Sequence, residues 1–427
     1  MHAWTSPSLP DLPGVGDPVH VHDTLAGALA PTRRGGEPAT LYVCGITPYD
    51  ATHLGHANTY VGFDLLVRAW RDAGREVQYV QNVTDIDDPL LERAAQTGQD
   101  WHELAQSQIE LYRTDMAALR VLAPTHLVGA VEAIPLVVDA VEQMLAEGHA
   151  YRVDLPAGAG GNEPGLGDVY ANVTDDSLFG TGVGMSWDDM LKVFAENGGD
   201  PDRAGKHNPL DPLLWRRTRP GEPDWDGATL GRGRPGWHIE CACIAMEHLT
   251  GVVEVQGGGR DLVFPHHEMS ESHLRVLTEQ PAPVMLHVHG GMVGYHGEKM
   301  SKSRGNLVLV SELLAQGTDP MAVRLVLLGH HFREDWEYTD ADLTEATARL
   351  SRWRTAMHQA QGPEAQTLLT RVRAAMADDL DALAAVQAVD EWVDAALAGA
   401  GAGSSEMSQA APELARRVVD ALLGVAV

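Results

Sequence analysis

Residues 41–70 read LYVCGITPYDATHLGHANTYVGFDLLVRAW and contain the pattern that decides the fold. The apolar run at 41–45 predicts a short buried strand, and the apolar residues from Tyr60 to Trp70 predict an amphipathic helix. A helix that opens just after a strand and a glycine turn directs free N–H groups and its positive dipole end at an anion. His53 and His56 share one face at that opening, where they can donate to phosphate oxygens. Taken alone, such a histidine pair is more often a packing or surface feature.

A second segment with phosphate-binding chemistry is KMSKS at residues 299–303. The chain has only four lysines, and two of them fall in this segment. Paired ammonium charges beside serine hydroxyls suit a clamp on a polyphosphate, although a solvated surface loop is the plainer interpretation of any one lysine pair. The two segments together predict nucleotide chemistry.

In these segments the sequence resembles class I aminoacyl-tRNA synthetases, whose HIGH and KMSKS signatures are matched with Leu54 in place of isoleucine. The resemblance implies an α/β fold: a doubly wound, Rossmann-like nucleotide-binding domain split by an insertion, followed by a C-terminal α-helical domain. It also implies activation of a carboxylic acid by ATP with magnesium, giving an acyl-adenylate and pyrophosphate. The catalytic residues would be His53, His56, Lys299 and Lys302, which stabilise the α-phosphorus and the leaving pyrophosphate.

Three cysteines in a chain without a signal peptide or a membrane-length apolar run exclude a disulfide scaffold and lead us to expect a reducing cytoplasm. Buried small hydrophobes are the ordinary interpretation of such cysteines, and their spacing alone does not indicate zinc. The stretches YVCGITPYD, GWHIEC and FPHHE, however, resemble cysteinyl-tRNA synthetases, which implies one zinc ion on Cys44, Cys241 and His266. Zinc with an open position can bind a substrate thiolate, so the expected substrate acid is cysteine.

Two details of the zinc prediction stay open in the sequence. The cysteinyl-tRNA synthetase pattern continues with an acidic ligand where this chain has Ser270, so we expect three protein ligands plus the substrate sulfur. His267 and Glu268 are candidate groups behind the ligands. Cys243 is expected to be a structural thiol, although a small register error would exchange it with Cys241.

Across most of residues 41–305 the chain resembles the cysteine ligases of mycothiol biosynthesis, paralogues of cysteinyl-tRNA synthetase. The discriminating stretch is ENGGDPDRAGKHNPLDPLLW, whose Gly198–Pro201 segment is characteristic of the ligases, while Asn197 departs from the expected arginine. The resemblance implies an amide between L-cysteine and the amine of glucosaminyl-inositol. The alternatives are a cysteinyl-tRNA synthetase lacking its anticodon-binding domain and a catalytically silent binding module.

Charge bears on the acyl acceptor, because nucleic-acid binding depends on Lys and Arg. The chain has 31 basic and 60 acidic residues, a net charge of −29. Residues 341–427 hold seven arginines, no lysine and twelve acids, so no basic platform for tRNA is visible there. We therefore expect small-molecule partners and no nucleic acid. The sequence shows no membrane-length apolar run and no long exposed apolar stripe, so we also expect no membrane association and a monomer.

The resemblance also implies the remaining site residues and the domain division. The cysteinyl-adenylate pocket would comprise Cys44, Gly45, Ile46, Thr47, Thr59, Asn82, Val83, Thr84, Trp237, Gly259, Arg260, Asp261 and Val293. The expected domains are an extension at 1–40, the first catalytic half at 41–135, a connecting insertion at 136–205, the second half at 206–305, and a helical domain at 306–427. The base for amine attack is left open between His238 and Asp85.

Periodicity supplies four further expectations. Residues 100–148 and 366–398 should each be continuously helical, and residues 412–423 should form a last helix. Residues 252–255 should form a strand, with Gly257–Gly259 as the turn after it.

Overall fold

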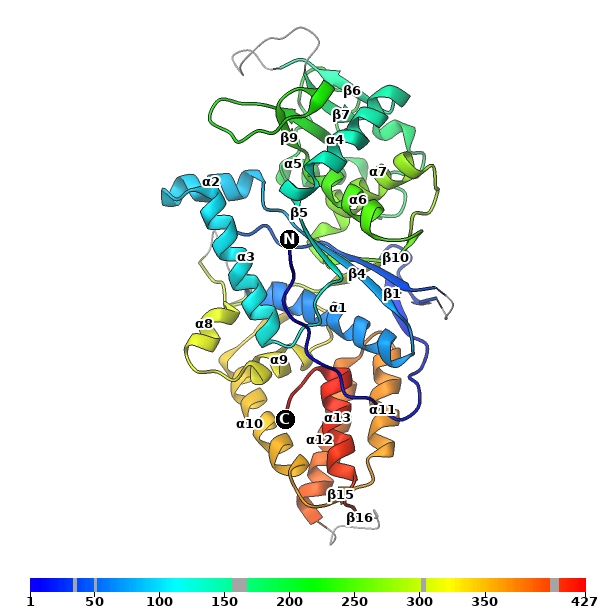
Figure 1. Ribbon diagram of the computed structural model, residues 1–427, viewed down its shortest axis with the longest axis vertical. Helices are drawn as coiled ribbons and strands as arrows, with labels where there is room; N and C mark the ends of the chain where they lie inside the picture. Colours follow the sequence, from blue (N-terminus) through cyan, green and yellow to red (C-terminus); the bar gives the residue numbers. More distant parts are fainter. Residues whose placement is uncertain (34–36, 50–51, 156–166, 301–304, 400–406) are drawn as a thin grey trace.

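The structure, a computed structural model, describes residues 1–33, 37–49, 52–155, 167–300, 305–399 and 407–427. At its centre lies a parallel five-stranded sheet with the order β11-β10-β3-β4-β5 (Figure 1). The strands are β3 (Ala39–Val43), β4 (Val77–Val83), β5 (His126–Gly129), β10 (Val253–Gly259) and β11 (Val284–Gly290). The winding direction reverses between β3 and β10, which is where ligands bind in doubly wound sheets. The predicted α/β fold class is confirmed.

The first crossover is α1 (Leu54–Asp72), whose buried apolar residues pack over β10, β11 and β4 of the sheet. The approach is close at Gly257, where a Cβ atom would lie 2.2 Å from the ring of Phe63. Gly257–Gly259 belong to strand β10 and pair with β11, so the expected turn at these residues is wrong. Glycine is needed here because the helix leaves no room for a side chain.

The expected continuous helix at 100–148 is also wrong. The segment forms α3 (Trp101–Ala118), β5 and α4 (Ala130–Glu147), preceded by α2 (Asp88–Thr97). Only four residues, HLVG, make up β5, and its parallel pairing with β4 decides their conformation. A strand this short carries no readable periodicity.

An insertion between β5 and β10 lies at one end of the molecule and carries an antiparallel sheet of order β6-β7-β8-β9 (Figure 1). Its elements are β6 (Ala150–Val153), β7 (Asp168–Ala171), α5 (Trp187–Glu196), β8 (Leu213–Arg217) and β9 (Gly233–Pro235). Helices α6 (Trp237–His248) and α7 (Glu268–Thr278) follow. The sheet continues past residue 205, beyond the boundary expected there; the other domain boundaries remain predictions.

A helical domain occupies the opposite end (Figure 1). Its helices are α8 (Val310–Ala315), α9 (Pro320–Leu328), α10 (Asp340–Met357), α11 (Gln366–Ala377), α12 (Ala382–Ala398) and α13 (Ala411–Leu423). The single helix expected at 366–398 is broken, because Asp379 and Leu380 each have φ of 55° and no α-helix continues through left-handed residues. The last helix is confirmed within one residue.

The smaller elements complete the described chain. The strands are β1 (His20–Asp23), β2 (Ala28–Pro31), β12 (Val293–Tyr295), β13 (Glu298–Lys299), β14 (Trp336–Tyr338), β15 (Gly362–Pro363) and β16 (Met407–Ser408). Short helical turns lie at Val173–Asp175, Ala228–Leu230, Arg260–Leu262 and Val263–His267. None of the helices in the described residues combines the length and the apolar composition needed to span a membrane.

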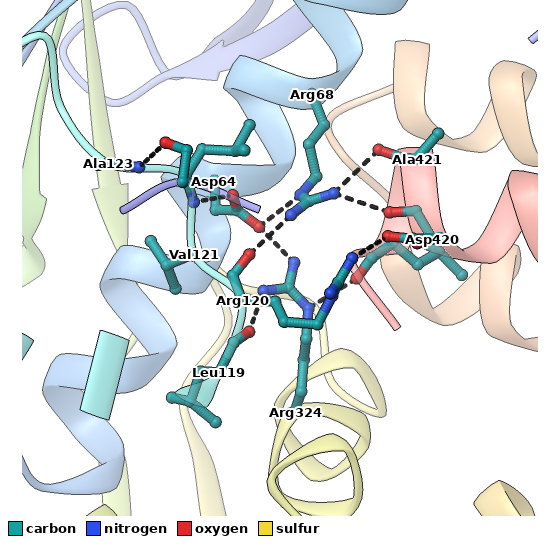
Figure 2. A network of polar contacts seen from close by, with 12 residues as sticks. Asp64, Arg68, Leu119, Arg120, Val121, Ala123, Arg324, Asp420 and Ala421 are labelled. Atoms are coloured by element: carbon teal, nitrogen blue, oxygen red, sulfur yellow. Dashed lines mark hydrogen bonds and ion pairs between the residues drawn. The ribbon is translucent and has the colours of Figure 1, made fainter. Parts of the chain in front are cut away.

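A buried polar network joins the helical domain to the nucleotide-binding domain (Figure 2). Asp64 on α1 pairs with Arg68 at 2.7 Å and with Arg324 on α9, and all three side chains are fully buried. Arg68 also donates to the carbonyls of Asp420 and Ala421 at 2.8 and 3.1 Å, and Arg324 donates to the carbonyl of Leu423. Two guanidiniums thus cap the C-terminal end of α13, where the helix dipole favours positive charge.

Candidate active site

A cleft of about 1040 Å³ opens at the carboxyl ends of β3 and β10 and extends to the insertion. A volume at the upper end of the usual range, about 300–1,000 Å³, suits more than one small ligand. The predicted residues that line it are Cys44, Gly45, Ile46, Thr47, His53, His56, Thr59, Trp237, Gly259, Asp261 and Val293. The structure therefore brings the nucleotide and cysteine candidates into one cavity.

The loop after β3 is held against β4 by a close backbone approach. The N–H of Gly45 donates to Oδ1 of Asn82 at 2.8 Å, and a Cβ atom on Gly45 would lie 1.6 Å from the Asn82 carbonyl oxygen. Asn82 in turn donates to Thr84 at 3.1 Å. Asn82, Val83 and Thr84 thus lie beneath the cleft and support its floor.

The two histidines at the start of α1 are placed by helix capping. His53 Nδ1 accepts from the N–H groups of Gly55 and His56 at 3.1 and 3.4 Å, and the imidazoles of His53 and His56 stack with centroids 3.8 Å apart. These two N–H groups are occupied, so the expectation that they are free for an anion is wrong. Because Nδ1 accepts, the neutral His53 ring carries its proton on Nε2, which is able to donate to a phosphate oxygen.

Cys44, Cys241 and His266 form a buried cluster whose ligand atoms all lie within 4.8 Å of one another. The two Sγ atoms are 3.9 Å apart, and Cys241 Sγ lies 3.2 Å from His266 Nε2. Tetrahedral zinc with bonds of about 2.3 Å to sulfur and about 2.0 Å to nitrogen requires similar separations. Two thiols and one imidazole are also soft donors of the kind zinc prefers, so the residues fit this ion.

The cluster favours an ionised thiol. Burial alone would raise the pKa of Cys241, but Cys44 and His266 outweigh it, and the pKa falls well below its usual value. Burial, followed by the neighbouring Cys241, raises the pKa of Cys44. A thiolate is the metal-binding form of cysteine, so Cys241 is prepared to bind a cation.

The groups around the cluster bear on both open details. His267 Nε2 lies 3.1 Å from Cys44 Sγ, and His267 Nδ1 lies 2.7 Å from His289. Ser270 donates to the carbonyl of His238 at 2.8 Å, and among the described residues the cluster comprises only Cys44, Cys241 and His266. Cys243 is buried and is not a member of the cluster, which agrees with the structural role expected for it.

Some predicted residues are placed elsewhere or not at all. Arg260 is absent from the cleft lining; its guanidinium pairs with Asp335 at 3.0 Å. The backbone of Lys299 pairs in β13, but its side chain and all of Lys302 lie outside the described residues. Asp85 accepts from Val131 N–H at 2.9 Å near the start of α4.

The sequence identified Gly198–Pro201, a segment that contributes to the side of the cleft formed by the insertion, only as a family marker, and assigned no site residue there. This side is lined by Asp87, Asp88, Glu92, Asp168, Tyr170, Glu196, Asp200, Arg203, Arg216, Arg219 and Arg234, among others. Asp87 caps α2 by accepting from Asp88 N–H at 2.8 Å, so its carboxylate has a local structural role as well as a place in the cleft wall. The arginines carry no local signal, because they are isolated in strands and loops that meet only in the folded chain.

The fold and this cleft define a class I synthetase catalytic domain, and the model for the family described as tRNA synthetases class I (C) catalytic domain matches residues 32–348. The chain belongs to this family, within the branch of L-cysteine:1D-myo-inositol 2-amino-2-deoxy-alpha-D-glucopyranoside ligases. Proteins of that name from Beutenbergia cavernae and Sanguibacter keddieii are 60% and 58% identical, each over 100% of both chains. Mycobacterium tuberculosis methionyl-tRNA synthetase with methionyl-adenylate shares the fold, with a TM-score of 0.61 at 16% identity over 91% of this chain and 92% of that one.

Proposed function

We propose that the protein joins L-cysteine to the amine of glucosaminyl-inositol in mycothiol biosynthesis, consuming ATP and releasing AMP and pyrophosphate. The observation that carries the proposal is the full-length identity of 58–60% to ligases of that name. The cleft supports the proposal independently. Its wall includes Cys44 of the buried Cys44–Cys241–His266 cluster, and the residues predicted to bind the nucleotide line the same cleft.

The first half-reaction is the attack of the cysteine carboxylate on the α-phosphorus of ATP. We assign the stabilisation of the phosphates to His53 and His56 together with Lys299 and Lys302, and ATP is expected to enter with magnesium. Thr47, Thr59 and Trp237 would enclose the cysteinyl group, while Gly259, Asp261 and Val293 would surround the adenosine. No residue forms a covalent bond to the substrate, so these groups act by orientation and charge.

Cys44, Cys241 and His266 would hold one zinc ion, which supplies a soft site for the substrate thiolate. A serine hydroxyl binds such a site poorly, so the ion would select cysteine. His267 and His238 contact the ligand side chains, at 3.1 Å from Cys44 and 3.1 Å from His266, and would fix their orientation. In the second half-reaction the amine attacks the cysteinyl carbonyl, the amide forms and AMP leaves.

We further propose a cytoplasmic monomer that acts on small molecules only. The test supplies purified protein with ATP, magnesium and cysteine, and with either glucosaminyl-inositol or total tRNA, and identifies the cysteine-bearing product by mass. The amide, with unmodified tRNA, is the expected result. Cysteinylated tRNA would make the protein a synthetase, and no AMP with either acceptor would leave only a binding module.

A further inference from the structure

The cleft has two sides, and the cysteinyl-adenylate accounts for only one of them. The nucleotide side comprises the loop after β3, the start of α1 and the segment following β11. The insertion side comprises the start of α2, strands β7 to β9 and the end of α5. Cys44 and Trp237 lie where the two sides meet, so a second substrate on the insertion side would face the activated acyl group.

Charge indicates what this insertion side accepts. Six carboxylates and four guanidiniums line it, a balance of −2. The arginines are paired in place: Arg216 with Asp88 at 3.2 Å, and Arg219 with Asp168 at 2.7 Å. A surface of alternating, mutually fixed donors and acceptors suits a hydroxyl-rich ligand, whereas a phosphodiester chain requires a surplus of positive charge.

Asp87 occupies the boundary between the two sides. Its Oδ1 caps α2, and within the described part of the chain no other hydrogen bond to this carboxylate occurs. Arg234, Asp88 and the zinc candidate His266 are its charged or titratable neighbours, with the buried Glu240 behind it. A cationic amine placed against Asp87 would therefore lie close to the group that holds the substrate cysteine.

The electrostatics of Asp87 support a cationic ligand. Asp87 is partly buried in the wall of the cleft, and within the described part of the chain no ion pair to its carboxylate occurs, whereas the neighbouring Asp88 pairs with Arg216 and Arg234. A carboxylate without a paired counter-ion is stabilised by an ammonium group. We propose that the insertion side of the cleft is the subsite for the acyl acceptor, an amine-bearing polyol, and that Asp87 binds its amine. This inference rests on the proposed function.

The decisive variant is Asp87→Asn, which retains an oxygen able to cap α2 and removes the charge. Asp100→Asn is the matched control, because Asp100 caps α3 in the same way outside the cleft lining. Each protein is assayed for cysteine-dependent ATP–pyrophosphate exchange and then for amide formation at varied acceptor concentration. We expect exchange within about threefold of the parent for both variants. With Asp87→Asn only, we expect a loss of about 10²-fold in kcat/KM for the acceptor, since removal of a charged hydrogen-bond partner costs about 1–2 powers of ten.

A second readout separates binding of the amine from general damage. An analogue of the acceptor with a hydroxyl in place of the amine should inhibit the parent weakly and should inhibit Asp87→Asn to about the same extent. The preference for an amine over a hydroxyl should therefore be present in the parent and absent in Asp87→Asn. The assignment is overturned if Asp87→Asn and Asp100→Asn behave alike. It is also overturned if Asp87→Asn loses pyrophosphate exchange and amide formation to the same degree. If Asp87→Asn does not fold, Asp87→Ser, which keeps a capping oxygen, is judged by the same criteria. Parent protein that exchanges pyrophosphate but cysteinylates only tRNA refutes the proposed function itself, independently of these variants.

Discussion

Asp64→Asn is the most informative test of how the helical domain is attached. The change keeps the shape of the side chain and an acceptor for the N–H of Leu122, which lies 2.7 Å from Oδ1. It removes the counter-ion of Arg68 and Arg324, whose side chains have 0% exposure. Burial, partly offset by Asp64, already lowers the pKa of Arg324 to about 10, so these charges cannot readily be left unpaired.

Removing one partner of a buried ion pair costs about 3–5 kcal/mol, because the other charge stays buried. We expect Asp64→Asn to lower the free energy of unfolding by this amount, measured by urea titration with circular dichroism and tryptophan fluorescence. If the helical domain unfolds first, two transitions should separate in the variant. Glu345→Gln is the control, because it breaks the exposed Glu345–Arg349 pair, and an exposed pair contributes about 0–1 kcal/mol. Arg349 keeps its second partner, Asp390, at 3.0 Å.

The pH dependence provides a sign test of the same argument. Burial raises the pKa of Asp64, but Arg68 and Arg324 outweigh it, so the folded-state pKa lies below the ordinary value. A depressed pKa contributes stability that is fully present above the unfolded-state pKa, about 3.9, and is lost as the pH falls through the folded-state value. The difference between parent and Asp64→Asn should be constant from about pH 5 to 8 and shrink below about pH 4. A cost below about 1 kcal/mol, equal to that of Glu345→Gln, would refute the reasoning.

Three further outcomes test the site. Cys241→Ser should lower bound zinc and reduce the preference for cysteine over serine in pyrophosphate exchange by at least about 10²-fold; full zinc content by elemental analysis would contradict the ligand assignment. Gly45→Ala should abolish exchange, because the new Cβ atom would lie 1.6 Å from the Asn82 carbonyl oxygen. Gly98→Ala, at the exposed end of α2, should retain exchange. An active Gly45→Ala would show that the backbone beneath the cleft can move to accept the methyl group. His53→Ala should lower kcat for exchange by about 10²-fold, and the loss of the helix cap should lower the free energy of unfolding by about 1 kcal/mol. His53→Asn should restore the stability but not kcat. If asparagine restores both, the role of His53 is limited to capping α1.

The sequence by itself determined the nucleotide fold, because strand, turn and helix signals are local, whereas the residues of the nucleotide side follow from the resemblance to class I synthetases and stay predictions. The same locality explains the misses. The four residues of β5 are too few for a period, and Gly257–Gly259 are extended only because Phe63 and β11 pack against them.

Only the tertiary structure decided how the distant parts of the site meet. Cys44, Cys241 and His266 were linked in sequence by a family pattern, while their 3.2 and 3.9 Å separations arise from β3, α6 and the turn before α7 packing together. The charges of the insertion side could not be foreseen, since Asp87 and Arg234 are 147 positions apart and come near each other only in the folded chain. Strand, turn and helix patterns depend on residues that are neighbours in sequence. The electrostatic field of a cleft, by contrast, is the sum of charges that the chain brings together only on folding.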